Sequence, residues 1–303
     1  MSTARLARPQ YQHAGLAAFA YLVINWFPIA ISCSLFAAWN AVTGAQLPVF
    51  ELTVFLVIFR QINVFTISSL FHRSYSHRQF QYHPFVEYWM RRWNWLWMGT
   101  GGRAWAMLHR WHHAAADTDE DPHSPTKAGG SLWNITGQTV RNYTRCIHEP
   151  ETFAKYASGL PDDRFEDFVR FFESRGFWVL ALSRVPVVAG VLCGGFMLVG
   201  LEAAVALPAA MMCLPGIMGS AWYSTVVMVN GLCHLIGYRI WDNDDTSTNL
   251  FPIDLLGWGE ALHHNHHQRQ SRANLGHARW EFDSGFWMLW LLSKVGIVRN
   301  LRP

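Results

Sequence analysis

Four long apolar blocks separated by polar segments set the hydrophobic pattern of this chain. Each block is close to the roughly 20 residues that an apolar helix needs to cross a bilayer. The blocks cover residues 17–40, 47–71, 185–201 and 203–229. The pattern predicts an all-α chain with four transmembrane helices in two hairpins. Together with the polar segments 72–176 and 234–303, we expect them to form a single domain over residues 1–303.

The basic residues are distributed as a membrane topology requires. Of the 24 Lys and Arg, two precede the first block, thirteen lie in segment 72–176 and seven follow residue 234. Cytoplasmic loops carry an excess of Lys and Arg, so we expect both termini and both polar segments, as a helical cap, on the cytoplasmic side. Arg60 is midway along the second block, and we expect that helix to extend past the bilayer and carry Arg60 towards the cytoplasmic face. In a soluble α-protein this segregation would be a coincidence.

Net charge and composition limit the kinds of partner that the protein is expected to bind. The formal net charge is +3 without a run of basic residues, which argues against a nucleic-acid partner and suits a surface that faces anionic lipid or an acidic protein. The five cysteines show no C-x-x-C spacing and are expected to be core residues. Six tryptophans within 80–111 predict either a helix at the membrane interface or an aromatic core under the cap, and 280–292 predicts a second interfacial helix.

Three histidine clusters carry the chemistry: H-R-S-Y-S-H at 72–77, H-R-W-H-H at 109–113 and H-H-N-H-H at 263–267. The second and third each contain a triad at offsets 0, 3 and 4. These offsets share one helical face, so each triad is expected to converge on one small volume. The five-residue offset of the first cluster splays its two histidines, and we expect each to reach a different metal. Asn230 and His234 are one turn apart where the fourth block ends.

Nine imidazoles are too many for one ion, so two metal ions are predicted. No cysteine is placed to complete a structural zinc site, whereas nitrogen-rich coordination with open positions suits iron that binds dioxygen. The full carboxylate set of soluble di-iron bundles, a Glu from each of two helices plus a Glu-x-x-His motif from each of two others, is absent from these clusters. A membrane protein that binds or transports metal is the alternative from another class. It would be expected to carry ionisable groups through the bilayer, and apart from Arg60 these helices offer almost none.

Taken together, these motifs resemble the integral-membrane fatty acyl desaturases of the stearoyl, delta-9 type. The resemblance runs from His72 to the C-terminus. It includes the three histidine boxes, D-P-H-S-P around His123, N-x-x-x-H from Asn230 and G-E-x-x-H from Gly259. It implies two iron ions as cofactors and dioxygen as co-substrate. The implied metal ligands are His72, His77, His109, His112, His113, Asn230 (weak or through water), His234, His263, His266 and His267.

Other residues have candidate supporting roles. Glu260 is one turn before the third triad, where it could accept a hydrogen bond from an imidazole, or be a solvated acid. His123 either supports the site or is a turn residue, and His264 is out of phase with its triad and is expected to support it rather than bind metal. Trp105 and Trp111 are candidate walls of a substrate tunnel. Arg73, Arg78 and Arg110 are expected to pair with carboxylates such as Asp117 or Asp121, or to meet phosphates.

The implied function is an oxygen-dependent di-iron acyl desaturase embedded in membrane lipid. Acyl-CoA desaturases commonly carry Arg-Asp before the second box, where this chain has Met107-Leu108. The acyl carrier therefore stays open among CoA, acyl carrier protein and phospholipid. Because no haem, flavin or iron-sulfur motif is present, electrons are expected from ferredoxin or cytochrome b5 with a reductase. Acyl hydroxylases and acetylenases share much of the motif set and are close alternatives.

Overall fold

Three long apolar helical segments form the extended part of the protein. The structure, a computed structural model, describes residues 10–127 and 131–303 and is mostly helical. The segments are α1 (Ala14–Thr43), α2 (Val49–Thr66) continuing into the π-helix η1 (Ile67–Ser76), and α10 (Ala203–Trp222) continuing into the π-helix η2 (Tyr223–Val229). All three are long and apolar enough to cross a membrane. They agree with three of the four predicted blocks.

The third predicted block gives a shorter helix. α9 covers Val185–Leu198, and its 14 residues rise only about 21 Å, against about 30 Å of hydrocarbon. Val199 and Gly200 end it, and Gly200 has a positive φ of 102°. α9 packs against α10, with which it forms the second hairpin. The structure thus supports three spans by length and composition and leaves the fourth unconfirmed.

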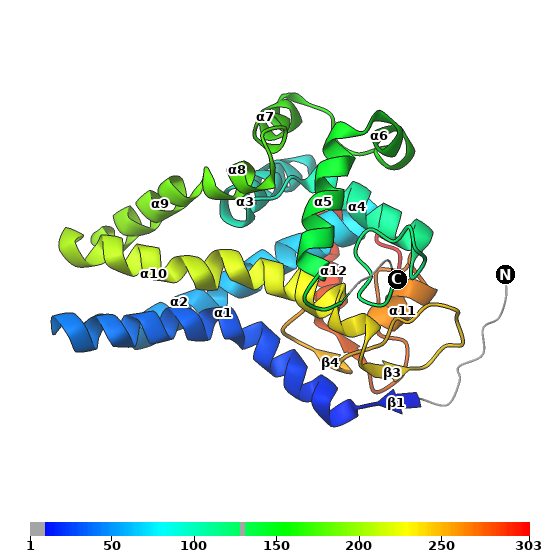
Figure 1. Ribbon diagram of the computed structural model, residues 1–303, viewed down its shortest axis with the longest axis horizontal. Coiled ribbons are helices and arrows are strands. Elements are labelled where there is room, and N and C mark those ends of the chain that lie inside the picture. Colours follow the sequence, from blue (N-terminus) through cyan, green and yellow to red (C-terminus); the bar gives the residue numbers. More distant parts are fainter. Residues whose placement is uncertain (1–9, 128–130) are drawn as a thin grey trace.

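Short elements gather at one end of the long helices (Figure 1). The helices are α3 (Pro84–Met98), α4 (Gly102–Ala115), α5 (Ile135–His148), α6 (Pro150–Tyr156), α7 (Arg164–Glu173), α8 (Phe177–Leu182), η3 (Leu232–His234), α11 (His263–Gln268) and α12 (Ser284–Lys294). Within the described ranges, three two-stranded sheets tie distant segments together. β1 (Gln10–Gln12) pairs with β3 (Gly237–Arg239), β2 (Gln81–Tyr82) with β6 (Val298–Arg299), both antiparallel, and β4 (Ile253–Asp254) runs parallel to β5 (Phe282–Asp283).

The tryptophan-rich segment combines the two predicted arrangements. Trp89 on α3 is 56% exposed, as expected of an interfacial residue, whereas Trp97 on the same helix is buried in the main core. On α12, Trp287 and Trp290 are also partly exposed. One face of each helix is therefore available to the membrane interface while the other covers the core.

Arg60 is buried among polar groups rather than exposed at a membrane face. Its guanidinium donates to the side chain of Asn25 on α1, to Ser224 on η2 (3.1 Å) and to the carbonyl oxygen of Leu256 (2.9 Å). Arg60 therefore ties α1, α2 and the 255–257 loop together. The charged side chain midway along α2 is thus engaged in structural hydrogen bonds. A transport pathway would need such a group to be free to bind the transported ion.

The N-terminal residues 1–9, which were predicted to lie on the cytoplasmic side, are outside the described residues. The extension of the single domain over the whole chain stays a prediction. At the other end, the C-terminal strand β6 is held next to the first histidine cluster by its pairing with β2.

Candidate metal centre

The two histidines of the first cluster meet because their helix changes pitch. η1 is a π-helix, and the backbone N–H of His77 donates to the carbonyl oxygen of His72, five residues earlier (3.2 Å). In an α-helix this offset would place the side chains about 140° apart. In a π-helix the i to i+5 bond closes a turn, and the imidazole centroids are 5.0 Å apart. The prediction that His72 and His77 reach different metals is wrong for this geometry.

The two triads are divided rather than each gathered on one point. On α4, His109 and His113 face η1, whereas His112 faces the opposite group of histidines. On α11, His266 joins the first group while His263 and His267 join the second. The 0, 3, 4 offset does place each triad on one side of its helix, but that side lies between two clusters. Each triad therefore contributes to both.

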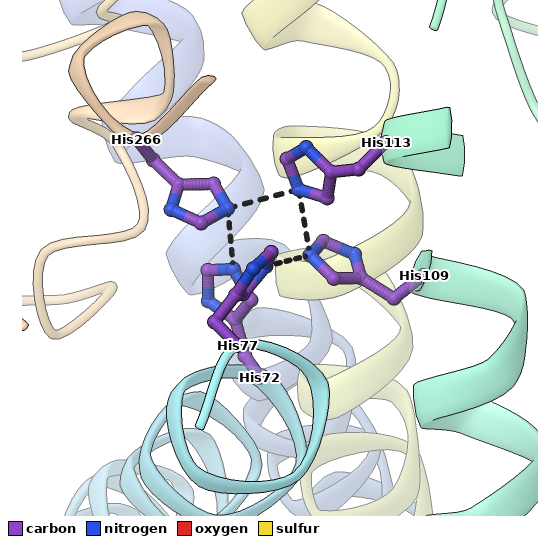
Figure 2. Close-up of side chains that lie close together, drawn as sticks. All are labelled: His72, His77, His109, His113 and His266. Carbon is purple, nitrogen blue, oxygen red and sulfur yellow. Dashed lines mark hydrogen bonds between the residues drawn. The ribbon is translucent and has the colours of Figure 1, made fainter. Parts of the chain in front are cut away.

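The structure gathers the histidines into two spatial groups. One group contains five imidazoles whose Nε2 atoms point towards one another (Figure 2). The Nε2–Nε2 distances are 2.9 Å for His72 to His266, 2.9 Å for His77 to His109, 3.0 Å for His109 to His113 and 2.9 Å for His113 to His266. Three of these residues are buried, while His77 and His113 are partly exposed. We call this group the five-histidine cluster.

The other spatial group contains four buried residues, His112, His234, His263 and His267. Nε2 of His234 is 3.1 Å from Nε2 of His263, and Nε2 of His112 is 3.4 Å from Nε2 of His267. We call it the four-histidine cluster. The two clusters together contain the nine histidines that the sequence predicts as ligands and no others.

The spacing of the nitrogen atoms fits a bound metal ion. Two ligands at right angles, each about 2.1 Å from an ion, lie about 3.0 Å apart, and tetrahedral ligands lie about 3.4 Å apart. The distances in the five-histidine cluster match the first value. The two nitrogen–nitrogen distances in the four-histidine cluster, 3.1 and 3.4 Å, extend from near the first value to the second. With all-imidazole donors and no cysteine in either group, the residues present suit a borderline transition metal such as iron.

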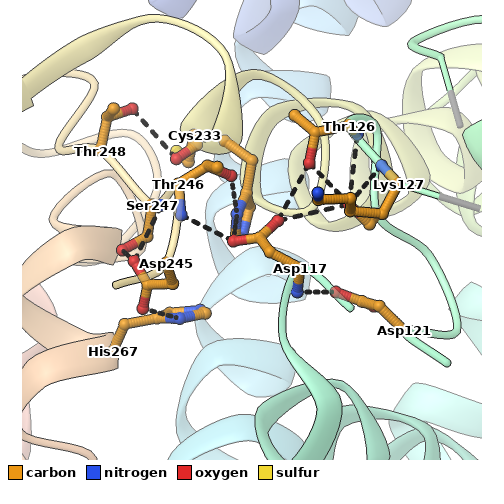
Figure 3. A network of polar contacts seen from close by, with 12 residues as sticks. Asp117, Asp121, Thr126, Lys127, Cys233, Asp245, Thr246, Ser247, Thr248 and His267 are labelled. Atoms are coloured by element: carbon orange, nitrogen blue, oxygen red, sulfur yellow. Dashed lines mark hydrogen bonds and ion pairs between the residues drawn. The ribbon is translucent and has the colours of Figure 1, made fainter. Parts of the chain in front are cut away.

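Carboxylates hold several of these rings in place through Nδ1. Asp121 lies 2.9 Å from His112, Asp245 3.0 Å from His267 and Glu260 2.6 Å from His72, in each case oxygen to Nδ1. Asp117 is 3.6 Å from Nδ1 of His234 and accepts the backbone N–H of Thr246 (Figure 3). An Nδ1–H that faces a carboxylate leaves Nε2 with its lone pair free to bind a metal.

Among these carboxylates, Glu260 was anticipated, but its partner is in the first box instead of the neighbouring triad. Asp117, Asp121 and Asp245 were not anticipated as supports of the histidines. Asp245 is 22 residues before His267, and a loop brings the two together. Only the tertiary path of that loop relates them, so no local spacing signals the pair.

Burial keeps most of these imidazoles neutral. It lowers the pKa of His109, His113, His263 and His266 well below 6.5, and neighbouring histidines lower it further. The pKa of His267 falls to about 4. His112 differs because the Asp121 carboxylate outweighs the effect of burial and raises its pKa. A neutral imidazole is the form that binds a metal.

An apolar cavity of about 320 Å³ leads away from the clusters. At one end it is lined by His109, Trp105 and Asn230, and it continues between α5 and α10 to Trp178 on α8, which is 63% exposed. A second, smaller cavity shares Trp105, His109 and Asn230 and is also lined by His72. A flexible apolar chain could therefore reach the five-histidine cluster from the α8 end.

Trp105 and Trp111 have different positions. Trp105 lines both cavities, and its ring stacks on His109 with centroids 5.1 Å apart. Trp111 stacks instead on Tyr156, with the guanidinium of Arg145 4.8 Å from its ring. It is not among the residues that line either of these two cavities. The tunnel role expected of Trp111 stays a prediction, whereas Trp105 lines both cavities.

The other candidate residues surround the clusters. Asn230 lies at the end of η2 and lines both cavities together with His109. His123 lies beside His112, with ring centroids 4.7 Å apart, and lines the larger cavity. His264 accepts the backbone N–H of Trp241 (3.0 Å), and its Nδ1 is 3.1 Å from Ser247, which donates to Asp245. His264 thus supports His267 through two intervening side chains.

The arginines next to the histidines were expected to pair with carboxylates such as Asp117 or Asp121. In the structure they do not pair with either of these two residues. Arg73 is buried and binds Asp283 (3.1 Å), the carbonyl oxygen of Trp258 and that of Ala273. Arg110 donates to the carbonyl oxygens of Tyr75, Ser76, Tyr156 and Ser158. Asp117 and Asp121 are already occupied by His234 and His112. The arginines therefore fix backbone segments that carry the ligands.

The sequence model of the fatty acid desaturase family matches residues 45–290. This range includes both clusters and the cavity. The chain belongs to the fatty acid desaturase family. Accordingly, this desaturase is an oxidoreductase that acts on acyl chains, and its histidine clusters are groups that could hold metal.

Curated relatives give the type of desaturase. This desaturase is 28% identical to delta-9 desaturase-like 5 protein of Arabidopsis thaliana over 78% of this chain and 72% of that protein. It is 27% identical to delta-9 acyl-lipid desaturase 1 of the same plant, over 79% and 73%. It is 28% identical to sn-1 stearoyl-lipid 9-desaturase of Anabaena variabilis, over 77% and 76%. The resemblance to delta-9 type desaturases is confirmed.

Proposed function

We propose that this chain is an oxygen-dependent di-iron desaturase that introduces a double bond into a lipid-linked acyl chain. The observation that carries the proposal is the pair of histidine clusters next to an apolar cavity, which reaches the five-histidine cluster at His109. Two iron ions would supply the reaction of dioxygen with an unactivated C–H bond. The nine histidines, with Asn230 as a weak or water-mediated ligand, would hold these ions.

The protein's own residues position the substrate and exclude water. Trp105 and Ile67 narrow the cavity beside His109, so an alkyl chain would present a limited number of its carbon atoms to the clusters. Fixing one C–C bond there provides the orientation that the reaction needs. Asp121, Asp245 and Glu260 keep Nε2 of their histidines available.

A lipid-linked substrate is favoured over acyl-CoA by the residues before the second box. Met107 is buried in the core and Leu108 lines the cavity, so neither offers a polar contact to a carrier headgroup. The far end of the cavity meets α8, whose Trp178, Val179 and Leu182 are exposed apolar residues suited to the bilayer. Two of the relatives named above act on acyl lipids, as their names say, which supports the same choice.

The proposed topology keeps four membrane spans, with both termini and the metal centre cytoplasmic. α9 and the apolar helix α8 before it would together complete the fourth crossing. The distribution of Lys and Arg supports this orientation. Neither hydroxylation, alkyne formation nor metal transport has a specific observation in its favour.

The test is expression in a host that lacks these unsaturated lipids, followed by mass spectrometry of each lipid class with double-bond localisation. The expected product is a double bond in a glycerolipid acyl chain. Metal content is measured on protein purified without chelator, and His112→Ala and His266→Ala should lose iron and product together. Zinc without iron, combined with no oxygen consumption, would refute the proposal. A hydroxyl group or triple bond in the product would instead redefine the reaction.

A further inference from the structure

The two histidine clusters differ in their access to the surface. All four residues of the four-histidine cluster are buried, whereas His77 and His113 of the five-histidine cluster are partly exposed. Electron transfer between proteins is favoured by a short path from the surface to the redox group. The five-histidine cluster is therefore the better entry point for electrons.

Basic residues follow the three histidine boxes, directly after His77 and His109 and shortly after the third box. We call the group the basic patch, and it consists of Arg78, Arg110, Arg269 and Arg272. Arg78 and Arg272 are exposed, and the other two are partly exposed. Among the described residues, no carboxylate lies within 4.0 Å of any of these four guanidinium groups, although the nearby loop carries the exposed acids Asp242 and Asp244.

Hydrogen bonds join the members of the basic patch into one surface. Arg78 and Arg110 both donate to the carbonyl oxygen of Ser158. Gln79, next to Arg78, donates through its side chain to the carbonyl oxygen of Gln270 (2.9 Å), which lies between Arg269 and Arg272. The patch thus combines the segments that follow the first, second and third histidine boxes.

The α11 end of the basic patch lies away from the proposed membrane region. In Figure 1, α11, which Arg269 follows, and the C-terminus lie at the opposite end of the molecule from the turn between α1 and α2. A surface placed there is suited to a soluble partner rather than to the bilayer. Its positive charge would attract a partner of negative charge and increase the rate of encounter.

We propose that the basic patch is the docking surface for a small acidic one-electron carrier protein, and that electrons enter the five-histidine cluster through His77 and His113. This inference rests on the proposed desaturase function. Desaturation removes two electrons and two protons from the acyl chain, while reduction of dioxygen to two water molecules takes four of each. Two further electrons, with two protons from solvent, must therefore come from two reduced carrier molecules.

The experiment uses the full-length protein in lipid nanodiscs and a plant-type [2Fe–2S] ferredoxin of net negative charge. The variant Arg78→Glu/Arg272→Glu reverses two exposed charges. The control Arg175→Glu reverses an exposed arginine at the end of α7, whose side chain donates to a backbone carbonyl. Binding of ferredoxin is measured directly, at low and high salt, and does not depend on turnover.

We expect the Kd for ferredoxin to rise about tenfold in the double variant at low salt and the difference to shrink at high salt, because screening weakens exposed charges. The control should bind as the wild type does. The rate driven by ferredoxin should fall relative to the rate driven by dithionite in the same variant. Unchanged ferredoxin binding would overturn the proposal, and so would a loss confined to binding of anionic lipid vesicles. If wild-type protein makes no unsaturated product even with dithionite, the proposed function fails, while the binding measurement still decides the role of the patch.

Discussion

Asp121 should control the metal affinity of the four-histidine cluster through the tautomer of His112. Both carboxylate oxygens lie near Nδ1 of His112, at 2.9 and 3.0 Å, and they also accept the backbone N–H groups of Asp117 (2.9 Å) and His123 (3.1 Å). Although burial opposes it, His112 and these donors hold the pKa of the Asp121 carboxyl well below its usual range. The carboxylate is thus surrounded only by donors.

Asp121→Asn keeps the size of the side chain but replaces one acceptor by an NH₂ group. In either orientation of the amide, this group faces a backbone N–H and competes with the Nδ1–H of His112. The ring would then be driven towards the tautomer with its proton on Nε2, the atom that faces the other histidines. Loss of such a carboxylate partner typically lowers metal affinity by about 10–100-fold, or about 1.4–2.8 kcal/mol.

The assay is competition with a graded series of chelators, with iron per protein measured by mass spectrometry. Asp119→Asn is the matched control, because Asp119 is an exposed residue of the same loop. We expect D121N to lose one iron at a lower chelator concentration than the wild type and D119N to behave as the wild type does. If D121N retained both ions with unchanged affinity, the proposed role of the carboxylate would be refuted.

Three further predictions concern stability and substrate fit. Burial raises the pKa of the Glu173 carboxyl to about 7 from 4.5, so the folded state favours the protonated form. Protonation of Glu173 therefore adds about 3 kcal/mol to the free energy of unfolding below pH 4.5, and this stabilisation is lost as the pH rises through 7. Glu173→Gln should abolish this pH dependence in thermal unfolding, and a slope equal to that of the wild type would contradict the assignment. Arg60→Met should lower the unfolding free energy by at least about 2 kcal/mol because Asn25 and Ser224 lose a charged donor, as denaturation in detergent would show. Val226→Phe should narrow the cavity and reduce turnover of long acyl chains more than that of short ones, with iron content unchanged; equal losses would argue that Val226 does not contact the substrate.

The apolar pattern and the histidine spacing predicted the residues of the site better than their arrangement. Three spans follow from length and hydropathy, because these are properties of a segment alone. The division of His109 and His112 between two clusters depends on where η1, η3 and α11 sit around α4. Similarly, Asp245 reaches His267 only because the 240–250 loop folds back over α11. Contacts of this kind are set by tertiary structure and leave no local period in the sequence.

The π-helix η1 gives the spacing of the first histidine box a structural meaning. Four residues separate His72 from His77, while two separate His109 from His112, and the two boxes lie in helices of different pitch. Deleting a single residue such as Ser74 would return this segment to α-helical register, with His72 and the shortened box's last histidine four positions apart. The deletion would leave both imidazoles on one side of the helix but would shorten the segment and rotate everything after it, including β2. The number of residues in the box therefore sets the phase between the membrane helix and the cap that follows it.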